Sequence, residues 1–511
     1  MPRLLSFTRT VVLSVILACA LSAQAPRDAR ALEPATNVTL PTYALLADDA
    51  VASMLRSYYF GRGLWRDCPE ARCWIHNSDW GADSLTNTLY LRWKMMGDVR
   101  MEPLLGALAT SARRYKPPCR AGRRCLLWSD VPMWDSVAAS REHEVDPSNP
   151  VPLQKAVAAF WAVEASPVYS VGACPAIRYQ RPFGRGDRLK TLETDSNGIK
   201  AALLLFGATH KARYLAIART RYGAVRRYFL DARLPLYSVY VFDDGTHCRQ
   251  ARHRYFASVN GNMIWNGLAL ARFTGDSRYR TNAVSTARAV ARYLSDPNGI
   301  FTDLQAENDL EEPLVEAMLD LARNEGFGFA RTWLLENASA AYSARRSDGT
   351  YGRFFDGPPP VASVTAWQTN GGFAAQIAAA SLKPRQIVSP PAWANAQYVP
   401  NEITHMPATL RFYGSGIAIF GTIGEICCQY GHARILIDGV ETTSGIGTWQ
   451  NKSSSGRSFP NSVLFAWRWP KPGAHEIRFA PGVYDAKEGG AFLHASGYAL
   501  IDPVPLGQSA L

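Results

Sequence analysis

Residues 267–276 read Gly267-Leu268-Ala269-Leu270-Ala271-Arg272-Phe273-Thr274-Gly275-Asp276, an apolar run followed by a short turn. A second run with apolar residues at helical spacing comes directly after the turn, so this stretch predicts two antiparallel helices. Comparable connectors recur roughly every 50–65 residues, which is typical of a repeat architecture built from helix pairs. The other connectors are Met96-Gly97-Asp98, Asp146-Pro147-Ser148-Asn149, Ala208-Thr209-His210 and Asn324-Glu325-Gly326.

Apolar periodicity predicts twelve helices within residues 44–382. Their ranges are 44–59, 80–95, 101–115, 130–143, 151–164, 195–208, 211–229, 258–273, 277–294, 309–323, 327–343 and 366–381. Short turns follow every second helix, so the first and the last helix have no partner joined to them by a short turn. In a closed ring these two helices can pair with each other, with 366–381 packed beside 44–59. The sequence therefore predicts a mainly α fold, an (α/α)6 toroid with inner helices 80–95, 130–143, 195–208, 258–273, 309–323 and 366–381.

The long connections of this ring all precede inner helices, so the inner helices begin at one loop-rich mouth, where scaffold folds place function. Acids and amides stand at these helix starts: Asp79, Asp130, Asp195, Asn197, Asn260, Glu311 and Gln368. N-capping accounts for part of this pattern, because short polar side chains satisfy the free amides of a helix start.

Tryptophans accompany the polar residues near the same starts: Trp80, Trp128, Trp134, Trp265 and Trp367. Flat aromatic faces cover the C–H side of a pyranose, and amides and acids bond its hydroxyls. The pattern thus favours a sugar site. The expected substrate-binding residues are Asp79, Trp80, Trp128, Trp134, Asn197, Asn260, Trp265, Glu311, Trp367 and Gln368. The alternative is that the tryptophans simply pack the loops.

Glycoside cleavage normally needs two carboxyl groups, one to protonate the leaving oxygen and one to act as nucleophile or base. Asp130 is the first candidate because it opens an inner helix between Trp128 and Trp134. Asp195 on the next inner helix is the expected partner. Other carboxyl groups remain open as the second group: Glu193, Asp79, Asp83, Glu311 and Glu312. No cofactor and no metal is predicted, since the cysteines and histidines lack matched ligand spacing.

The amino-acid composition of the chain changes after Leu382. Residues 383–408 are rich in Pro, Ala and Gln and predict a linker. Short β-rich runs broken by glycine follow and predict a small all-β sandwich over 409–505. The predicted strands are 411–420, 433–438, 462–467, 475–479 and 495–501. The runs Gly414–Gly421 and Ala433–Gly439 resemble the galactose-binding-like jelly roll, which implies a carbohydrate-binding-like module.

Residues 1–25 have the pattern of a signal peptide, with Arg3 and Arg9 before an apolar stretch that is too short for a stable membrane anchor. The expected location is secreted or periplasmic, with lipid anchoring at Cys19 as an alternative.

The other eight cysteines favour disulfides, of which Cys68/Cys73, Cys119/Cys125 and Cys174/Cys248 are the candidate pairs. The net charge is +12 among 511 residues, but the basic residues are scattered. This excludes nucleic acid as the expected partner. No transmembrane segment and a monomeric state are expected.

Four stretches of residues 44–382 resemble glycoside hydrolase family 76, the α-1,6-mannanases with an (α/α)6 fold. They are Leu127-Trp128-Ser129-Asp130-Val131-Pro132-Met133-Trp134, Ser196-Asn197-Gly198, Asn260-Gly261 with Thr274-Gly275-Asp276, and Asn337-Ala338 with Trp367-Gln368. The family carries two adjacent aspartates in the first stretch, a nucleophile and then an acid/base. Here Ser129-Asp130 leaves the pair incomplete. Asp130 stands in the acid/base place, or in the nucleophile place if the alignment shifts by one residue.

The resemblance implies a secreted glycoside hydrolase that cleaves a polysaccharide, with an α-mannan as the candidate substrate. Two alternatives stay open. One is a non-catalytic carbohydrate-binding protein on the same scaffold. The other is a different (α/α)6 activity such as a polysaccharide lyase, for which Arg252-His253-Arg254-Tyr255 offers a base and cations.

Overall fold

The computed structural model describes residues 41–69, 73–111, 128–182, 188–231, 233–250, 255–302, 311–361, 364–383, 393, 396–423, 432–447, 459–481 and 492–503. Six helices in these ranges lie inside a ring and begin at its mouth: α2 (Trp80–Met96), α4 (Asp130–Val145), α6 (Leu192–Thr209), α8 (Ala257–Thr274), α10 (Glu312–Arg323) and α12 (Ala366–Ser381). Six others lie outside them: α1 (Tyr43–Tyr58), α3 (Glu102–Thr110), α5 (Pro150–Glu164), α7 (Ala212–Tyr228), α9 (Ser277–Tyr293) and α11 (Gly328–Ser343).

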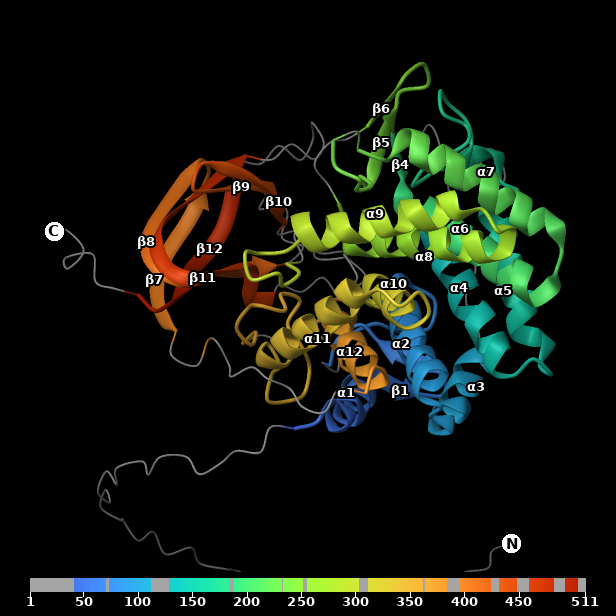
Figure 1. Ribbon diagram of the computed structural model, residues 1–511, viewed down its shortest axis with the longest axis horizontal. Coiled ribbons are helices and arrows are strands. Elements are labelled where there is room, and N and C mark those ends of the chain that lie inside the picture. The colour runs from blue at the N-terminus through green and yellow to red at the C-terminus, as the bar shows by residue number, and fades with distance from the viewer. Residues whose placement is uncertain are drawn as a thin grey trace, which may run out of the picture. The chain divides into compact units, whose positions relative to one another are not determined.

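The helices close into the predicted (α/α)6 toroid (Figure 1). Each inner helix contacts the next one along the chain, and α12 contacts α2, which completes the ring. The last inner helix, α12, also packs against the first helix of the chain, α1. This confirms the predicted closure, in which two helices that lack a neighbour in sequence pair with each other.

The inner helices are buried on nearly every side, as their apolar and small residues require. Small residues set the spacing between them. A Cβ added to Gly261 in α8 would lie 2.3 Å from the backbone nitrogen of Leu314 in α10. The glycine therefore allows α8 and α10 to approach closely, which narrows the centre of the ring.

The long connections contain strands that the sequence did not indicate. Strands β1 (Tyr59–Gly61), β2 (Leu64–Arg66) and β3 (Ile75–His76) form one small antiparallel sheet before α2. Strands β4 (Leu189–Thr191), β5 (Tyr240–Asp243) and β6 (Cys248–Gln250) form a second. Two to four residues are too few to show a period of two, so sequence periodicity misses such strands. The short 3-10 turn η2 (Pro167–Tyr169) belongs to the connection before α6, whereas η1 (Val99–Met101) lies in the short turn between α2 and α3.

Some predicted boundaries are wrong. The helix predicted at 101–115 divides into η1 and α3, and α3 ends at Thr110. The helix predicted from 195 begins three residues earlier, at Leu192, with Thr191 as its N-cap. The helix predicted from 309 begins at Glu312, where Pro313 occupies a first-turn position that needs no amide donor.

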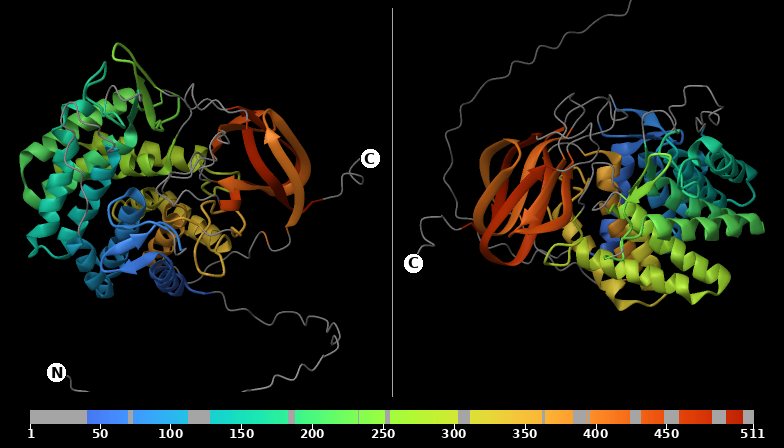
Figure 2. Two further views of the ribbon diagram at one scale, coloured as in Figure 1. Left: turned by 180° about the vertical axis from the view of Figure 1, so that it is seen from behind. Right: turned by 90° about the horizontal axis from the view of Figure 1, so that it is seen from above.

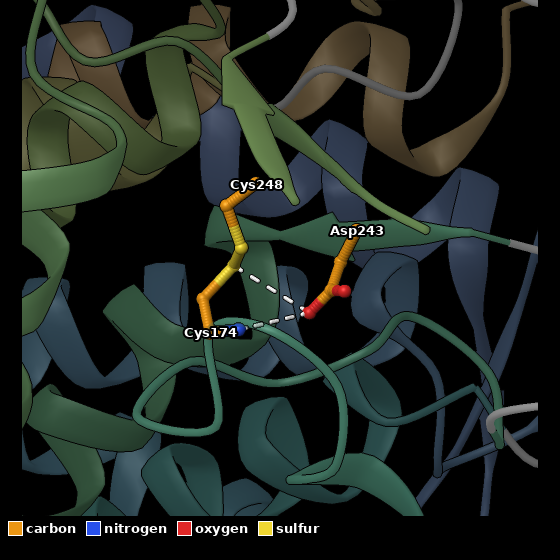
Figure 3. A group of neighbouring side chains, drawn as sticks. All are labelled: Cys174, Asp243 and Cys248. Atoms are coloured by element: carbon orange, nitrogen blue, oxygen red, sulfur yellow. Dashed lines mark hydrogen bonds between the residues drawn. A yellow bond between two sulfur atoms is a disulfide. The ribbon is translucent and has the colours of Figure 1, made fainter. Parts of the chain in front are cut away.

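Two of the predicted disulfides lie in the described residues and are confirmed, Cys68–Cys73 and Cys174–Cys248. Figure 3 shows the second beside Asp243. The carboxylate of Asp243 accepts hydrogen bonds from the backbone amides of Ala173 and Cys174, and Lys190 Nζ lies 3.2 Å from it. Both thiols are used in the disulfide. The disulfide and the Asp243–Lys190 ion pair therefore hold the loops at the mouth together. Cys119, Cys125, Cys427 and Cys428 lie outside the described residues.

We expect the Cys174→Ser/Cys248→Ser double variant to lose about 4 kcal/mol of unfolding free energy, because the bond closes a loop with a sequence separation of 74. The Cys68→Ser/Cys73→Ser variant opens a separation of 5 and should lose about 2 kcal/mol. Urea unfolding, followed by tryptophan fluorescence, measures the unfolding free energy of each variant and of the parent. A larger loss in the short-loop variant would contradict this ranking.

The C-terminal part is all-β, as predicted. It forms one six-stranded antiparallel sheet in the order β10-β9-β11-β8-β12-β7 (Figure 2, orange to red). The strands are β7 (Gln397–His405), β8 (Ala408–Ile423), β9 (His432–Ile437), β10 (Val440–Gly447), β11 (Phe459–Pro481) and β12 (Phe492–Ile501). The predicted linker 383–408 is therefore wrong from Gln397 onward. Two strands predicted at 462–467 and 475–479 are one continuous strand, whose register shifts between Arg468 and Gly473.

No helix in the described part of the chain is both long and apolar enough to cross a membrane. The predicted signal peptide, residues 1–25, and the lipid-anchoring alternative at Cys19 lie outside the described residues.

Candidate active site

The starts of two neighbouring inner helices carry the carboxyl groups Asp79 and Asp130. Asp79 is the N-cap of α2, and its Oδ1 accepts a hydrogen bond from the Trp80 amide at 2.7 Å. Asp130 is the first residue of α4, and its side chain is buried. A hydrogen bond joins the segment before α2 to the second turn of α4, since Ser78 Oγ donates to Asp135 Oδ2 at 2.7 Å. Asp79 and Asp130 thus stand at the starts of two helices that contact each other.

The charge of Asp130 acts on the titration of Asp79. Burial raises the pKa of Asp79 to about 7, against the charge of His76, and the negative charge of Asp130 raises it further. Burial also raises the pKa of Asp130 to about 6, although the backbone amides of Asp130 and Val131 favour its ionised form. At a pH between these two values Asp79 keeps its proton while Asp130 is ionised. Two carboxyl groups in unlike protonation states can donate and accept protons near neutral pH.

The β2–β3 hairpin adds two residues that the sequence analysis did not select, Asp67 and His76. The imidazole Nε2 of His76 forms an ion pair with Asp67 Oδ1. Burial lowers the pKa of His76, but the hydrogen bond and charge of Asp67 outweigh burial and raise it to about 9. The Ala366 amide donates to the Asp67 carbonyl oxygen at 2.7 Å, which ties the hairpin to the start of α12. The pair Cys68/Cys73, which lies between Asp67 and His76, was the one signal in the sequence.

Three of the predicted tryptophans lie at the mouth. The rings of Trp80 and Trp367 pack with centroids 4.9 Å apart, and the Trp367 indole N–H has no hydrogen-bond partner among the described residues. Trp128 is half-buried, and the Arg181 guanidinium lies 3.9 Å from its ring centroid. Trp80, Trp134 and Trp367 all belong to the hydrophobic core, and Trp367 is only 1% exposed. Trp265 lies deeper in α8 beneath Lys200. For these four tryptophans the packing favours the structural alternative, whereas Trp128 at the mouth is partly exposed.

Most of the predicted amides are engaged within the protein. Asn260 accepts from the Tyr237 amide and donates to the Tyr237 carbonyl oxygen, which pins the preceding loop. Asn197 donates to the Glu193 carbonyl and accepts from Asn262. Gln368 completes a capping box with Thr365.

Glu311, the N-cap of α10, is buried against Gly371. A Cβ added to Gly371 would lie 2.6 Å from the Glu311 carboxylate. Close packing of α10 on α12 thus surrounds this carboxyl group.

Asp195, the expected partner of Asp130, faces away from it. Its Oδ2 accepts from the Arg178 amide at 3.0 Å, and its Oδ1 lies 3.4 Å from Arg221 Nε on the outer helix α7. Burial raises its pKa, although both arginines lower it. The structure brings Asp130 together with Asp79 rather than with Asp195.

Below the mouth, a central charge cluster of Arg141, Lys200, Glu312 and Glu316 joins α4, α6 and α10. Lys200 Nζ donates to Glu316 Oε2 at 2.6 Å, and Arg141 Nη2 donates to Glu316 Oε1. Burial raises the pKa of Glu316, but the two cations outweigh burial and lower it to about 2. The cluster links helices across the ring and holds its centre together.

No family model and no curated protein sequence matches the chain. Several solved structures share the fold of its helical part. The α-1,6-mannanase GH76A of Salegentibacter sp. HEL1_6 has a TM-score of 0.58 at 17% identity, over 67% of this chain and 100% of that one. An inactive variant of that enzyme, in complex with α-1,6-mannotriose, has a TM-score of 0.56 at 18% identity, over 67% and 100% of the two chains.

Two other structures extend the comparison. A family 76 α-mannanase of Bacteroides thetaiotaomicron gives a TM-score of 0.55 at 14% identity, over 67% of this chain and 96% of that one. An unsaturated glucuronyl hydrolase of Bacillus sp. GL1 gives 0.50 at 13% identity, over 67% and 97%. The helical part of the chain therefore has the (α/α)6 toroid fold seen in family 76 glycoside hydrolases. The paired carboxyl groups stand at the mouth of that toroid.

Proposed function

We propose that the chain is a glycoside hydrolase that cleaves a polysaccharide, with an α-mannan as the candidate substrate. One observation carries this proposal: Asp79 and Asp130 stand at the starts of the adjacent inner helices α2 and α4, and the charge of Asp130 acts on Asp79, with pKa values of about 7 for Asp79 and about 6 for Asp130. Hydrolysis of a glycosidic bond needs two carboxyl groups that differ in protonation at the working pH. The Ser129-Asp130 sequence lacks the adjacent aspartate, and Asp79 supplies the second carboxyl group from the neighbouring helix.

In this mechanism one carboxyl group protonates the leaving oxygen, while the other attacks the anomeric carbon or activates a water. Trp128, two residues before Asp130, is half-buried and offers aromatic surface to a sugar ring. The α-mannan is favoured by the α-1,6-mannanases that share the fold. Two disulfides support an exported protein. Export by the N-terminal segment and a monomeric state belong to the same proposal.

The test is incubation of the purified chain with α-1,6-mannan and a panel of other glycans. We expect reducing ends to appear, with oligosaccharide products seen by mass spectrometry at masses that include one added water. An unsaturated product with ultraviolet absorbance would instead identify a lyase. Binding without turnover of any glycan would identify a carbohydrate-binding protein and contradict the hydrolase proposal.

A further inference from the structure

A charged dyad stands beside the carboxyl pair. Asp67 follows β2, His76 ends β3, and Cys68–Cys73 joins the two sides of this hairpin. His76 is three residues before Asp79, and its imidazole is held by the ion pair with Asp67 and by a hydrogen bond to the backbone of Ser78, the residue before the N-cap Asp79. The hairpin therefore presents a cation to one member of the pair.

The charged groups that act on Asp79 come from three elements. His76 lowers the pKa of Asp79, whereas Asp67 and Asp130 raise it. Asp130 has different surroundings: burial, two backbone amides of its own helix start, and Tyr169 from η2 nearby. Both carboxyl groups stand at helix starts, which favour the ionised form of each. They differ in their charged neighbours, because His76 and Asp67 act on Asp79 alone.

We infer that His76, held by Asp67, is a positioning residue for Asp79, so that Asp79 carries the catalytic proton and Asp130 is its ionised partner. This inference rests on the proposed function, and it reverses the roles that the sequence resemblance implies when Asp130 takes the acid/base place. Without the imidazolium, Asp79 would hold its proton too tightly, because burial and two anions all oppose its ionisation. With it, the pKa of Asp79 stays at about 7, where an acid donates efficiently at neutral pH.

The expected pH dependence follows from this assignment. Activity requires Asp130 ionised and Asp79 protonated, so kcat/KM rises through a pKa of about 6 and falls through a pKa of about 7. Removal of the His76 cation raises the pKa of Asp79. The alkaline limb of His76→Gln should therefore move up by about 1 pH unit or more, and the acidic limb should move less.

The experiment measures the Asp79 carboxyl titration directly, by carbon NMR of protein labelled at aspartate carboxyl carbons, with the signal assigned by Asp79→Asn. It compares the parent with His76→Gln and with the double variant Asp67→Asn/His76→Gln, which removes both charges of the buried pair. We expect the Asp79 midpoint to rise in both, and less in the double variant because the opposing anion is also gone. His143→Gln, on a histidine at the far end of α4, should leave the midpoint in place.

The two readouts separate the inference from the proposed function. An unchanged Asp79 midpoint in both His76 variants, with the parent melting temperature retained, overturns the inference. A shift of the acidic limb alone in His76→Gln also overturns it, because Asp79 would then act in its ionised form. A raised NMR midpoint in a protein that turns over no glycan supports the link between His76 and Asp79 and sinks the hydrolase proposal alone.

Discussion

Asp79→Asn and Asp130→Asn should each lower kcat on α-1,6-mannan by about 10²- to 10⁴-fold. An amide keeps the size of the carboxyl group but can neither give nor take the proton, so the loss should appear in kcat more than in KM. Asp130 is buried and Asp79 is half-buried, and the hydrogen bonds of both carboxyl groups go to the backbone amides of their own helix starts. The melting temperature should therefore stay within a few degrees of the parent value.

The matched control is Asp244→Asn, an aspartate in the turn after β5 whose carboxylate bonds only to its own loop among the described residues. Its kcat should equal that of the parent. If Asp79→Asn retained full activity while Asp130→Asn lost it, Asp79 would be removed from the mechanism. The second carboxyl group would then have to come from elsewhere at the mouth.

Glu316→Gln should lower the free energy of unfolding by about 3–5 kcal/mol, because it leaves Lys200 and Arg141 buried without their shared carboxylate. The remaining acid, Glu312, lies 3.7 Å from Arg141 and compensates only part of the charge. Burial raises the pKa of Glu312 to about 7, so this carboxyl group is not fully ionised at neutral pH. Urea unfolding at pH 7 measures the effect.

Glu476→Gln offers the comparison, since it removes an acid from an exposed pair with Arg411 on the β-sheet. Exposed pairs contribute about 0–1 kcal/mol, so this variant should unfold close to the parent. Equal losses in the two variants would show that the central charge cluster does not hold the ring together.

The helix pairs could be predicted from sequence because their ends are encoded locally. Gly97 and Gly275 adopt positive φ where α2 and α8 end, and Asp79 and Asp276 cap helix starts. Ring closure followed from counting unpaired helices. The small strands of the mouth and the strand β7 could not be predicted, because partners distant in sequence stabilise them.

The site could be predicted in part. Asp130 and Asp79 were selected because the inner helices begin at one mouth, which places their first residues at the same level along the ring axis. The level does not determine which way a side chain points. Asp195 points toward Arg221 on the outer helix, and only tertiary packing decides that orientation. His76 could not be selected, because its ion pair with Asp67 depends on the folded hairpin.

The pairing of α1 with α12 has a consequence for the order in which the chain can fold. The first helix finds its partner only when the last inner helix has been made, so its apolar face stays uncovered while nearly all of the ring is synthesised. A ribosome-bound or truncated chain that stops before residue 366 would present this face to chaperones or to aggregation. Completion of the toroid is therefore a late event, and deletion of α1 should leave α12 without one of its neighbours.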